Sequence, residues 1–136
     1  MTQENKELLL KDICGRLPYG VKGLVTFNGN IFMSQVQTED RTIDGKLYYR
    51  FAEFQDSWYD NVTIKPYLFP ISSMSEDLTN ELYTNLTELE LKAINDEIEH
   101  SAVSAFEIDF YHKHHIDYRG IIPMGLANDA TGLNIY

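Results

Sequence analysis

Hydrophobic side chains near the start of the chain recur at helical spacing and predict a helix over residues 3–15. The apolar residues that share one face of this helix are Leu8, Leu9, Ile13 and Cys14. Gly15 and the later Pro18 both favour the end of a helix, so we expect a glycine cap there. Cys14 is the only cysteine, and the pattern places it on the buried face.

From Val21 the apolar positions alternate every second residue, which is the period of a half-buried strand. The Asn-Gly pair at residues 28–29 is a strong hairpin signal, and residues 31–36 supply the returning strand. The Asp-Gly pair at residues 44–45 marks a second turn before an aromatic-rich strand pattern over residues 47–54. Hairpin connections of this kind predict an antiparallel meander.

The second half of the chain begins with one more strand pattern and then becomes helical. Residues 62–68 predict a fourth strand, in which Pro66 favours an edge or a bulge. Ser73 and Glu76 have the spacing of a capping box at a helix start. The leucines that follow at helical spacing are Leu78, Leu82, Leu86 and Leu89. We expect a last helix over residues 101–115 and, after it, an extended segment folded back on the body.

The helical and strand patterns are segregated along the chain, which favours an α+β fold over a parallel doubly wound sheet. The 136 residues are expected to form a single domain, residues 1–136, around one core. We predict an N-terminal helix, a three- to four-stranded antiparallel meander and two to three helices packed on one sheet face. An extended C-terminal tail completes the expected fold.

The net charge of −10 is concentrated in one quarter of the chain. Residues 76–109 hold ten acidic side chains against Lys92 alone. Such a field repels nucleic-acid phosphates, so no direct nucleic-acid binding is expected, whereas a basic protein surface would be attracted. The alternative interpretation is a solvated outer face that keeps the protein soluble. The residues that we expect to carry an interaction are Glu88, Glu90, Glu97 and Glu99.

The cluster of residue types that bind metals comprises His112, His114, His115 and Asp117. The alternative is that these histidines cap a helix C-terminus, where histidine side chains interact favourably with the free carbonyl groups. The spacing lacks the framework of zinc signatures, so we expect no metal and no cofactor. No motif of nucleophilic catalysis is present, and we assign no catalytic residue.

The arginines, the tyrosines and Trp58 have the side chains that would bind a nucleotide or another small anionic ligand. The alternative is that the aromatic residues build the core and the arginines pair with nearby acids. No phosphate-loop or dinucleotide fingerprint favours the ligand.

Three stretches of the chain have distinctive amino-acid sequences. They read KDICGRLPYGV at residues 11–21, IKPYLFPISSM at 64–74 and HHIDYRGIIPMGLA at 114–127. In this order they resemble a family of short uncharacterised proteins of gut Bacteroidetes and their phages and prophages. The resemblance implies a bacterial cytoplasm and a mobile element as the setting, and it carries no assigned catalytic residue.

The three stretches also have a structural interpretation as a helix-to-strand turn, the end of a sheet and the end of a helix. In the third stretch, an ion pair between Asp117 and Arg119 or a hydroxyl bond from Tyr118 would pin the tail. The alternative is a small-ligand site in these stretches. Its candidate residues are Tyr19, Tyr67, His115, Asp117, Tyr118 and Arg119.

Our leading hypothesis for function is a non-enzymatic binding protein of a phage or mobile element, whose acidic helical region binds a basic surface of a host protein, for example in counter-defence. A small-ligand binder that sequesters a nucleotide signal is the second hypothesis. A hydrolytic enzyme that uses His115 and Asp117 is the third. We expect a cytoplasmic location without a membrane span, because no apolar run approaches the roughly 20 residues needed. A symmetric homodimer is the default among oligomers.

Overall fold

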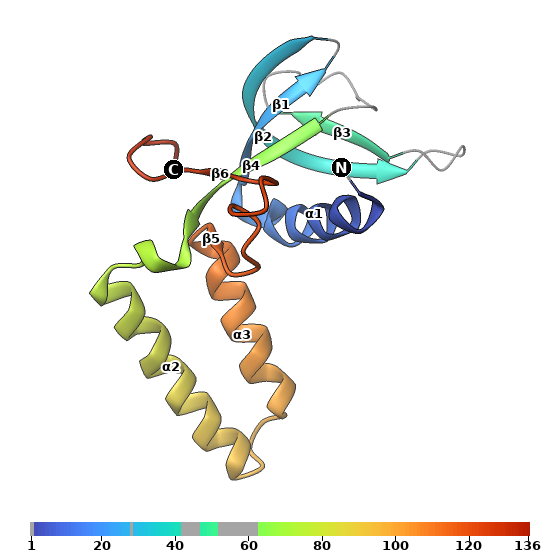
Figure 1. Cartoon of the computed structure of the whole chain (residues 1–136). Coiled ribbons are helices and arrows are strands. Elements are labelled where there is room, and N and C mark those ends of the chain that lie inside the picture. The colour runs from blue at the N-terminus through green and yellow to red at the C-terminus, as the bar shows by residue number, and fades with distance from the viewer. Residues whose placement is uncertain (1, 28, 42–46, 52–62) are drawn as a thin grey trace.

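The computed structural model describes residues 2–27, 29–41, 47–51 and 63–136. Helix α1 (Gln3–Arg16) is followed by strands β1 (Lys22–Phe27), β2 (Asn30–Arg41), β3 (Leu47–Phe51) and β4 (Thr63–Pro70). Helices α2 (Glu76–Ile94) and α3 (His100–Lys113) come next, and the short strands β5 (Ile116–Asp117) and β6 (Asn128–Asp129) lie in the last segment. The α+β prediction is confirmed (Figure 1). The predicted turn at 44–45 and the end of the predicted third strand, residues 52–54, lie outside the described residues.

Helix α1 begins with a side-chain cap, because the Thr2 hydroxyl accepts a hydrogen bond from the Asn5 amide at 3.1 Å. The predicted glycine cap at Gly15 is wrong, since the helix continues to Arg16. Gly15 serves close packing instead: a Cβ atom there would lie 2.4 Å from Cε1 of His112. The left-handed residue is Gly20, at φ 73°, which closes a short 3-10 turn before β1.

The sheet has the strand order β3-β2-β1-β4-β5, and β6 also pairs with β4. Strands β1, β2 and β3 form the predicted antiparallel meander, and β4 returns to lie antiparallel beside β1. Strands β5 and β6 then pair with β4 in parallel. Pro66 lies opposite Gly23 of β1, and the pairing of β4 with β6 and β5 begins only at Tyr67. Among the described residues no strand pairs with Pro66 on its other side, which agrees with the edge that we expected for it.

The main core forms where α1 and the last segment pack on the sheet. Leu9 and Ile13 of α1 meet strand residues such as Val25 and Leu68, and Ile121 joins them from the last segment. Burial of large aliphatic side chains of this kind is worth about 1.5–3 kcal/mol each. Cys14, predicted on the buried face, is half-buried.

Helices α2 and α3 form a hairpin with a core of its own. Leu82 and Leu86 of α2 pack with Phe110 and Tyr111 of α3 and with Ile116. We expected these helices on one face of the sheet, but Figure 1 shows that the hairpin projects away from the α1 and sheet body. Only the ends of α2 and α3 nearest β4 and β5 adjoin the body, so the opposite end stands free.

The start of α2 lies two residues after the capping box that we expected. Ser75 is the N-cap, and its hydroxyl accepts from the Leu78 amide at 3.1 Å. The Ser73 hydroxyl donates instead to the Pro70 carbonyl at 2.6 Å and closes the 3-10 turn between β4 and the helix.

Candidate functional site

The helical hairpin carries the concentrated negative charge on its outer surface. Of the ten acidic residues between 76 and 109, all except Glu107 are exposed. Within the described part of the chain, the one ion pair that any of them forms is between Glu88 and Lys92, at 3.6 Å. Both side chains of this pair are exposed, where an ion pair contributes little. The hairpin therefore presents a negative surface to solvent.

The four glutamates singled out from the sequence all lie toward the free end of the hairpin. Glu88 and Glu90 belong to the last turns of α2, and Glu97 and Glu99 to the connection between α2 and α3. The chain reverses at this connection with the help of Asp96, which takes a left-handed conformation at φ 55°. We call the segment 88–100 the hairpin tip.

The hairpin tip also exposes apolar side chains. Leu91 is 57% exposed and Ile94 is 71% exposed, although both are large aliphatic residues. A shallow groove of about 330 Å³ lies beside Ile94, between the end of α2 and the start of α3. The residues that line it are Glu90, Ala93, Ile94, His100, Val103 and Ser104. The tip thus combines acidic and apolar groups on one exposed surface.

A buried charge network anchors the other end of the hairpin to the body. Asp12 and Arg16 of α1 are both 0% exposed, and the Arg16 guanidinium donates from Nε and Nη2 to the Asp12 carboxylate at 2.8 and 3.1 Å. Arg16 Nη2 also donates to the Ile116 carbonyl at 2.7 Å. Arg119 approaches Asp12 from the last segment at 3.2 Å. One carboxylate therefore joins α1 to the segment that follows α3.

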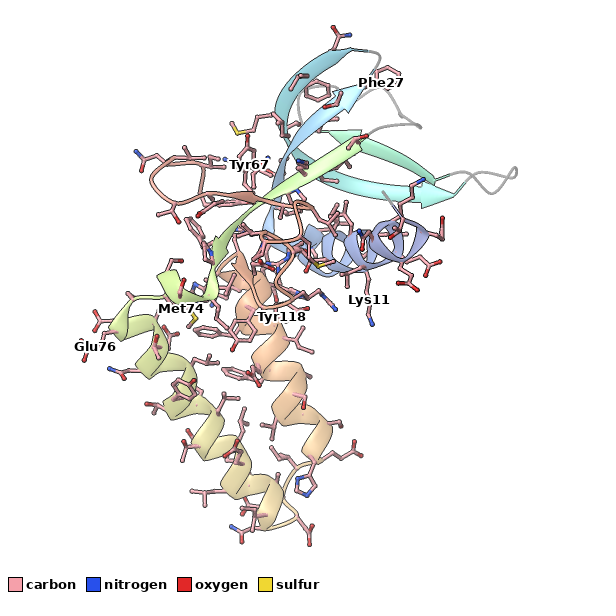
Figure 2. The ribbon with its side chains drawn as sticks, viewed as in Figure 1. Lys11, Phe27, Tyr67, Met74, Glu76 and Tyr118 are labelled. Carbon is pink, nitrogen blue, oxygen red and sulfur yellow. The ribbon has the colours of Figure 1, made fainter. Side chains whose placement is uncertain are left out.

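Tyr118 and His112 extend this junction onto α3. The Tyr118 hydroxyl is 2.9 Å from Nε2 of His112, and the Tyr118 ring stacks on Tyr111 with 5.3 Å between centroids. Burial and the nearby Arg16 charge lower the pKa of His112. A neutral imidazole whose Nε2 accepts a hydrogen bond from the Tyr118 hydroxyl fits this environment. Figure 2 shows Tyr118 where α3 meets the body.

The structure divides the six candidate ligand residues among three places. Tyr118 and Arg119 lie at the charge network just described, and Asp117 precedes them as the last residue of β5. Tyr19 is at the side of α3, where its hydroxyl donates to the carboxylate of Asp109, a bond that raises the pKa of Tyr19. Tyr67 and His115 both contact Tyr136. The six residues do not line one pocket.

The expected ways of pinning the tail are confirmed in part. The Tyr118 hydroxyl does bond back, to His112, but Arg119 pairs with Asp12 rather than with Asp117. Both oxygens of Asp117 accept backbone amides, from Ile121 and Ile122, at 2.9 Å each. Its carboxylate is thus used to fold the last segment, and it has no hydrogen bond to His115 of the kind that a hydrolytic pair would require.

The predicted cluster of metal-ligand residue types does not converge. His112 lies in the last turn of α3 in contact with Gly15, whereas His115 lies beyond the helix at φ 58°. Across the ranges that the structure describes, no group of three or more histidine, cysteine or acidic side chains is placed to hold a metal ion.

The sequence analysis missed three groups that define these sites. Leu91 and Ile94 lie off the leucine stripe of α2, and their apolar character at exposed helix positions was the available signal. Asp12 and Arg16 are opposite charges four residues apart on the same helix face as Leu9 and Ile13, which signals a buried pair. Nothing in the sequence pointed to Tyr136.

Acidification should destabilise the fold through its histidines. Burial lowers the pKa of His112 and His114, and it lowers that of His115 to about 4. These side chains titrate at about 6.5 in an unfolded chain, so the unfolded state binds more protons than the native state between about pH 6.5 and 4. Stability should therefore fall as the pH drops through this window, which urea unfolding at several pH values measures.

The matched control for this pH dependence is His115→Asn, because asparagine does not titrate and tolerates a left-handed backbone. Its urea midpoint should depend less steeply on pH between 6.5 and 4 than that of the wild type. If the urea midpoint depends on pH equally steeply in the two proteins, His115 does not contribute to the pH dependence of stability.

Comparisons with known proteins add no family and no relative. No family model matches the chain, and neither a curated protein nor a solved structure matches it. Among the described residues, no helix is both long enough and apolar enough to cross a membrane.

Proposed function

We propose that this chain is a non-enzymatic binding protein whose hairpin tip docks on a basic, partly apolar surface of a partner protein. The observation that carries the proposal is the presence of Glu88, Glu90, Glu97 and Glu99 around the exposed Leu91 and Ile94. These groups lie at the end of the hairpin remote from the body (Figure 1).

Charge alone does not distinguish a docking surface from a solvated helix face, because acidic surfaces commonly serve solubility. The exposed apolar residues of the hairpin tip favour a docking surface. Protein interfaces typically have an apolar centre with a polar or charged rim, and Leu91 and Ile94 supply such a centre beside the groove at Val103. The surrounding glutamates would then speed encounter and select the partner.

The chemistry of the tip defines the partner. Clustered lysine or arginine side chains would face the four glutamates, and one or two apolar side chains would enter the groove between α2 and α3. A nucleic acid offers no positive charge and is repelled by the same field. The resemblance to proteins of gut Bacteroidetes and their phages adds the expectation that the partner is a protein of the bacterial host.

The small-ligand alternative draws on a different observation. Nη1 of Arg16 is buried without a hydrogen-bond partner among the described residues, which is the kind of group that a small anion satisfies. Asp12, however, already neutralises part of the charge of Arg16 and Arg119. The network of Asp12, Arg16 and Arg119 should therefore bind an anion more weakly than two unpaired arginines would. For this reason we place the small-ligand function second. Heat-released small molecules from protein purified out of its host would test it.

The test of the docking proposal compares two sets of neutralised glutamates. The tip variant carries Glu88→Gln, Glu90→Gln, Glu97→Gln and Glu99→Gln. The control variant carries Glu4→Gln, Glu7→Gln, Glu76→Gln and Glu81→Gln, which change the net charge equally but lie on α1 and in the part of α2 nearest the body. Affinity purification from host lysate with each bait, and then titration of the purified partner, gives the affinities.

The proposal predicts one partner with a basic binding surface that the wild type and the control variant bind equally. The tip variant should bind it at least about tenfold more weakly, because close charge pairs at an interface can contribute about 1.5 kcal/mol or more and about 1.4 kcal/mol corresponds to a factor of ten in affinity. Equal affinity of the tip variant, or a captured partner that binds through an acidic or uncharged surface, would contradict the proposal. If the wild type captures no partner, this result would also count against the docking proposal.

A further inference from the structure

The shallow groove beside Ile94 continues along helix α3 toward the body. A second hollow, of about 480 Å³, lies where α3 approaches the 3-10 turn after β4 and the last segment of the chain. Ser104 lines both hollows, so the two adjoin at this residue. The residues that line the second hollow are Ile71, Ser104, Glu107, Ile108, Tyr111 and Tyr118. We call the two hollows together the α3 groove.

One face of α3 lines this groove over its whole length. His100, Ser104, Ile108 and Tyr111 follow each other at intervals of four, four and three residues, and residues spaced in this way share one side of a helix. At a rise of about 1.5 Å per residue, the stripe is about 16 Å long. The groove therefore runs for three helical turns, from the hairpin tip to the body.

The α3 groove exposes aliphatic side chains along its length. Ile94 lies at the tip, Ile108 on α3 and Ile71 near the body. Ile108 is 41% exposed and Ile71 is 51% exposed. A single exposed apolar residue is common on a protein surface, but these three line adjoining hollows that the side chains of a partner would enter. Burial of the three isoleucines would favour binding in proportion to the apolar area removed from water.

The same groove carries negative charge. Glu90 lines the hollow at the tip, and Glu107 lines the hollow near the body. The Tyr111 hydroxyl donates to the Glu107 carboxylate at 3.1 Å and fixes its position. In the part of the chain that the structure describes, neither hollow is lined by a lysine or an arginine. The charge that complements the α3 groove is therefore positive.

The backbone of α3 determines which kind of chain segment fits the groove. Its amide and carbonyl groups bond within the helix, so an extended peptide laid along it would leave its own backbone groups without partners on α3. A helical segment satisfies its own backbone and contributes only side chains. A second copy of the hairpin is disfavoured by charge, because residues 76–109 of each copy hold ten acidic side chains against Lys92 alone.

We infer that the α3 groove binds a basic amphipathic helix of the partner protein, which lies along α3 from the hairpin tip to the body. Apolar side chains at every third or fourth position of this helix pack on Ile94, Ile108 and Ile71. Lysine or arginine side chains on its flanks pair with Glu90 and Glu107. The inference rests on the docking role proposed for the hairpin tip, and it specifies the part of the partner that docks there as a third helix beside α2 and α3.

The test uses the full chain and an acetylated, amidated peptide of about 18 residues, in which leucines share one helix face and lysines occupy the other positions. A control peptide contains the same residues in an order that spreads the leucines around the helix. The amphipathic peptide should bind the wild type at least about tenfold more tightly than the control peptide does, because only the amphipathic one presents a continuous apolar face to the groove.

Ile108→Lys places a positive charge in the middle of the α3 groove. It should weaken binding of the amphipathic peptide at least about tenfold, because like charges across an interface repel. Ala102→Lys is the matched control, since it adds the same charge at an exposed position of α3. Ala102 lies two residues before Ser104, and residues so spaced do not share a helix face. The control should change the affinity by less than about threefold, because its charge lies outside the groove and is screened by salt.

Glu107→Gln gives an independent measurement if Ile108→Lys does not fold. Glutamine keeps an acceptor for the Tyr111 hydroxyl and removes only the charge, so the variant should bind the amphipathic peptide about two- to fivefold more weakly, as expected for the loss of one partly exposed ion pair. Glu81→Gln removes a charge from an exposed position of α2 that lines neither hollow, and its affinity should match that of the wild type.

Equal binding of the two peptides would overturn the inference in favour of attraction by charge alone. Equal affinity of Ile108→Lys and the wild type for the amphipathic peptide would overturn it as well, because the helix would then lie elsewhere. Dimers of the wild type that Ile108→Lys abolishes would mean that a second copy occupies the groove. In all three cases the docking role of the tip stands if the partner protein still binds the four-glutamate tip variant more weakly, whereas unchanged affinity of that variant contradicts the docking role itself.

Discussion

Replacement of Asp12 by alanine should lower the free energy of unfolding by about 3–5 kcal/mol, because it leaves a buried arginine without its counter-charge. Arg16 is fully buried, and among the described residues its guanidinium would keep only the Ile116 carbonyl as an acceptor in the variant. Arg119 would lose its ion pair with Asp12 as well. A loss of this size is a large fraction of the roughly 5–15 kcal/mol by which domains are usually stable. Urea unfolding followed by circular dichroism measures it.

The control for this prediction removes both charges together. Asp12→Leu with Arg16→Met replaces the pair by apolar side chains of similar volume, and such replacements of buried pairs are often neutral or stabilising. The double variant should therefore be more stable than Asp12→Ala. A loss below about 1 kcal/mol in Asp12→Ala would place its cost within the usual range of ordinary point mutations and would show that the pair does not anchor the fold.

Replacement of Leu82 by alanine should lower stability by about 2–5 kcal/mol through the cavity that it leaves between α2 and α3. Leu82 is 2% exposed and packs at the centre of the hairpin core with Phe110 and Tyr111. The hairpin has few contacts with the sheet, so its amides should lose protection against hydrogen exchange more than those of β1 and β2.

The matched control is Leu91→Ala, the same change at an exposed position of the same helix. It should alter stability by no more than about 0.5 kcal/mol, and it should weaken binding at the hairpin tip. Equal destabilisation by the two variants would mean that Leu91 is packed in solution, and the tip would then lose its apolar centre.

The sequence predicts the elements of this fold better than their arrangement. The leucines of α2 and the alternating residues of β1 act through local periodicity, so they were sufficient to indicate a helix and a strand. The place of β4 beside β1 depends on pairing between strands that are far apart in the sequence, and no local pattern encodes it. The projection of the hairpin likewise depends on Leu82 and Phe110 packing with each other rather than with the sheet.

The hairpin tip and the charge network were also predictable to different degrees, because only the first depends on a pattern that is local in the sequence. The four glutamates of the tip follow from charge concentration, which is visible in the sequence. The three distinctive stretches do meet. Asp12 and Arg16 from the first contact Arg119 and Ile116 from the third, and Phe69 from the second pairs with Ile116. Their meeting requires helix α1 and β5 to lie side by side, and only the tertiary structure provides this. The role of Gly15, which makes room for His112, has the same origin.

The most direct test of the docking role of the hairpin tip is the salt dependence of partner binding by the wild type and the tip variant. Surface charges are screened beyond about 10 Å at 0.1 M salt, so the affinity of the wild type should fall steeply between low and high salt. The tip variant should be weaker at low salt and nearly insensitive to salt. An affinity that neither salt nor the four substitutions change would contradict the account, because the partner would then bind elsewhere.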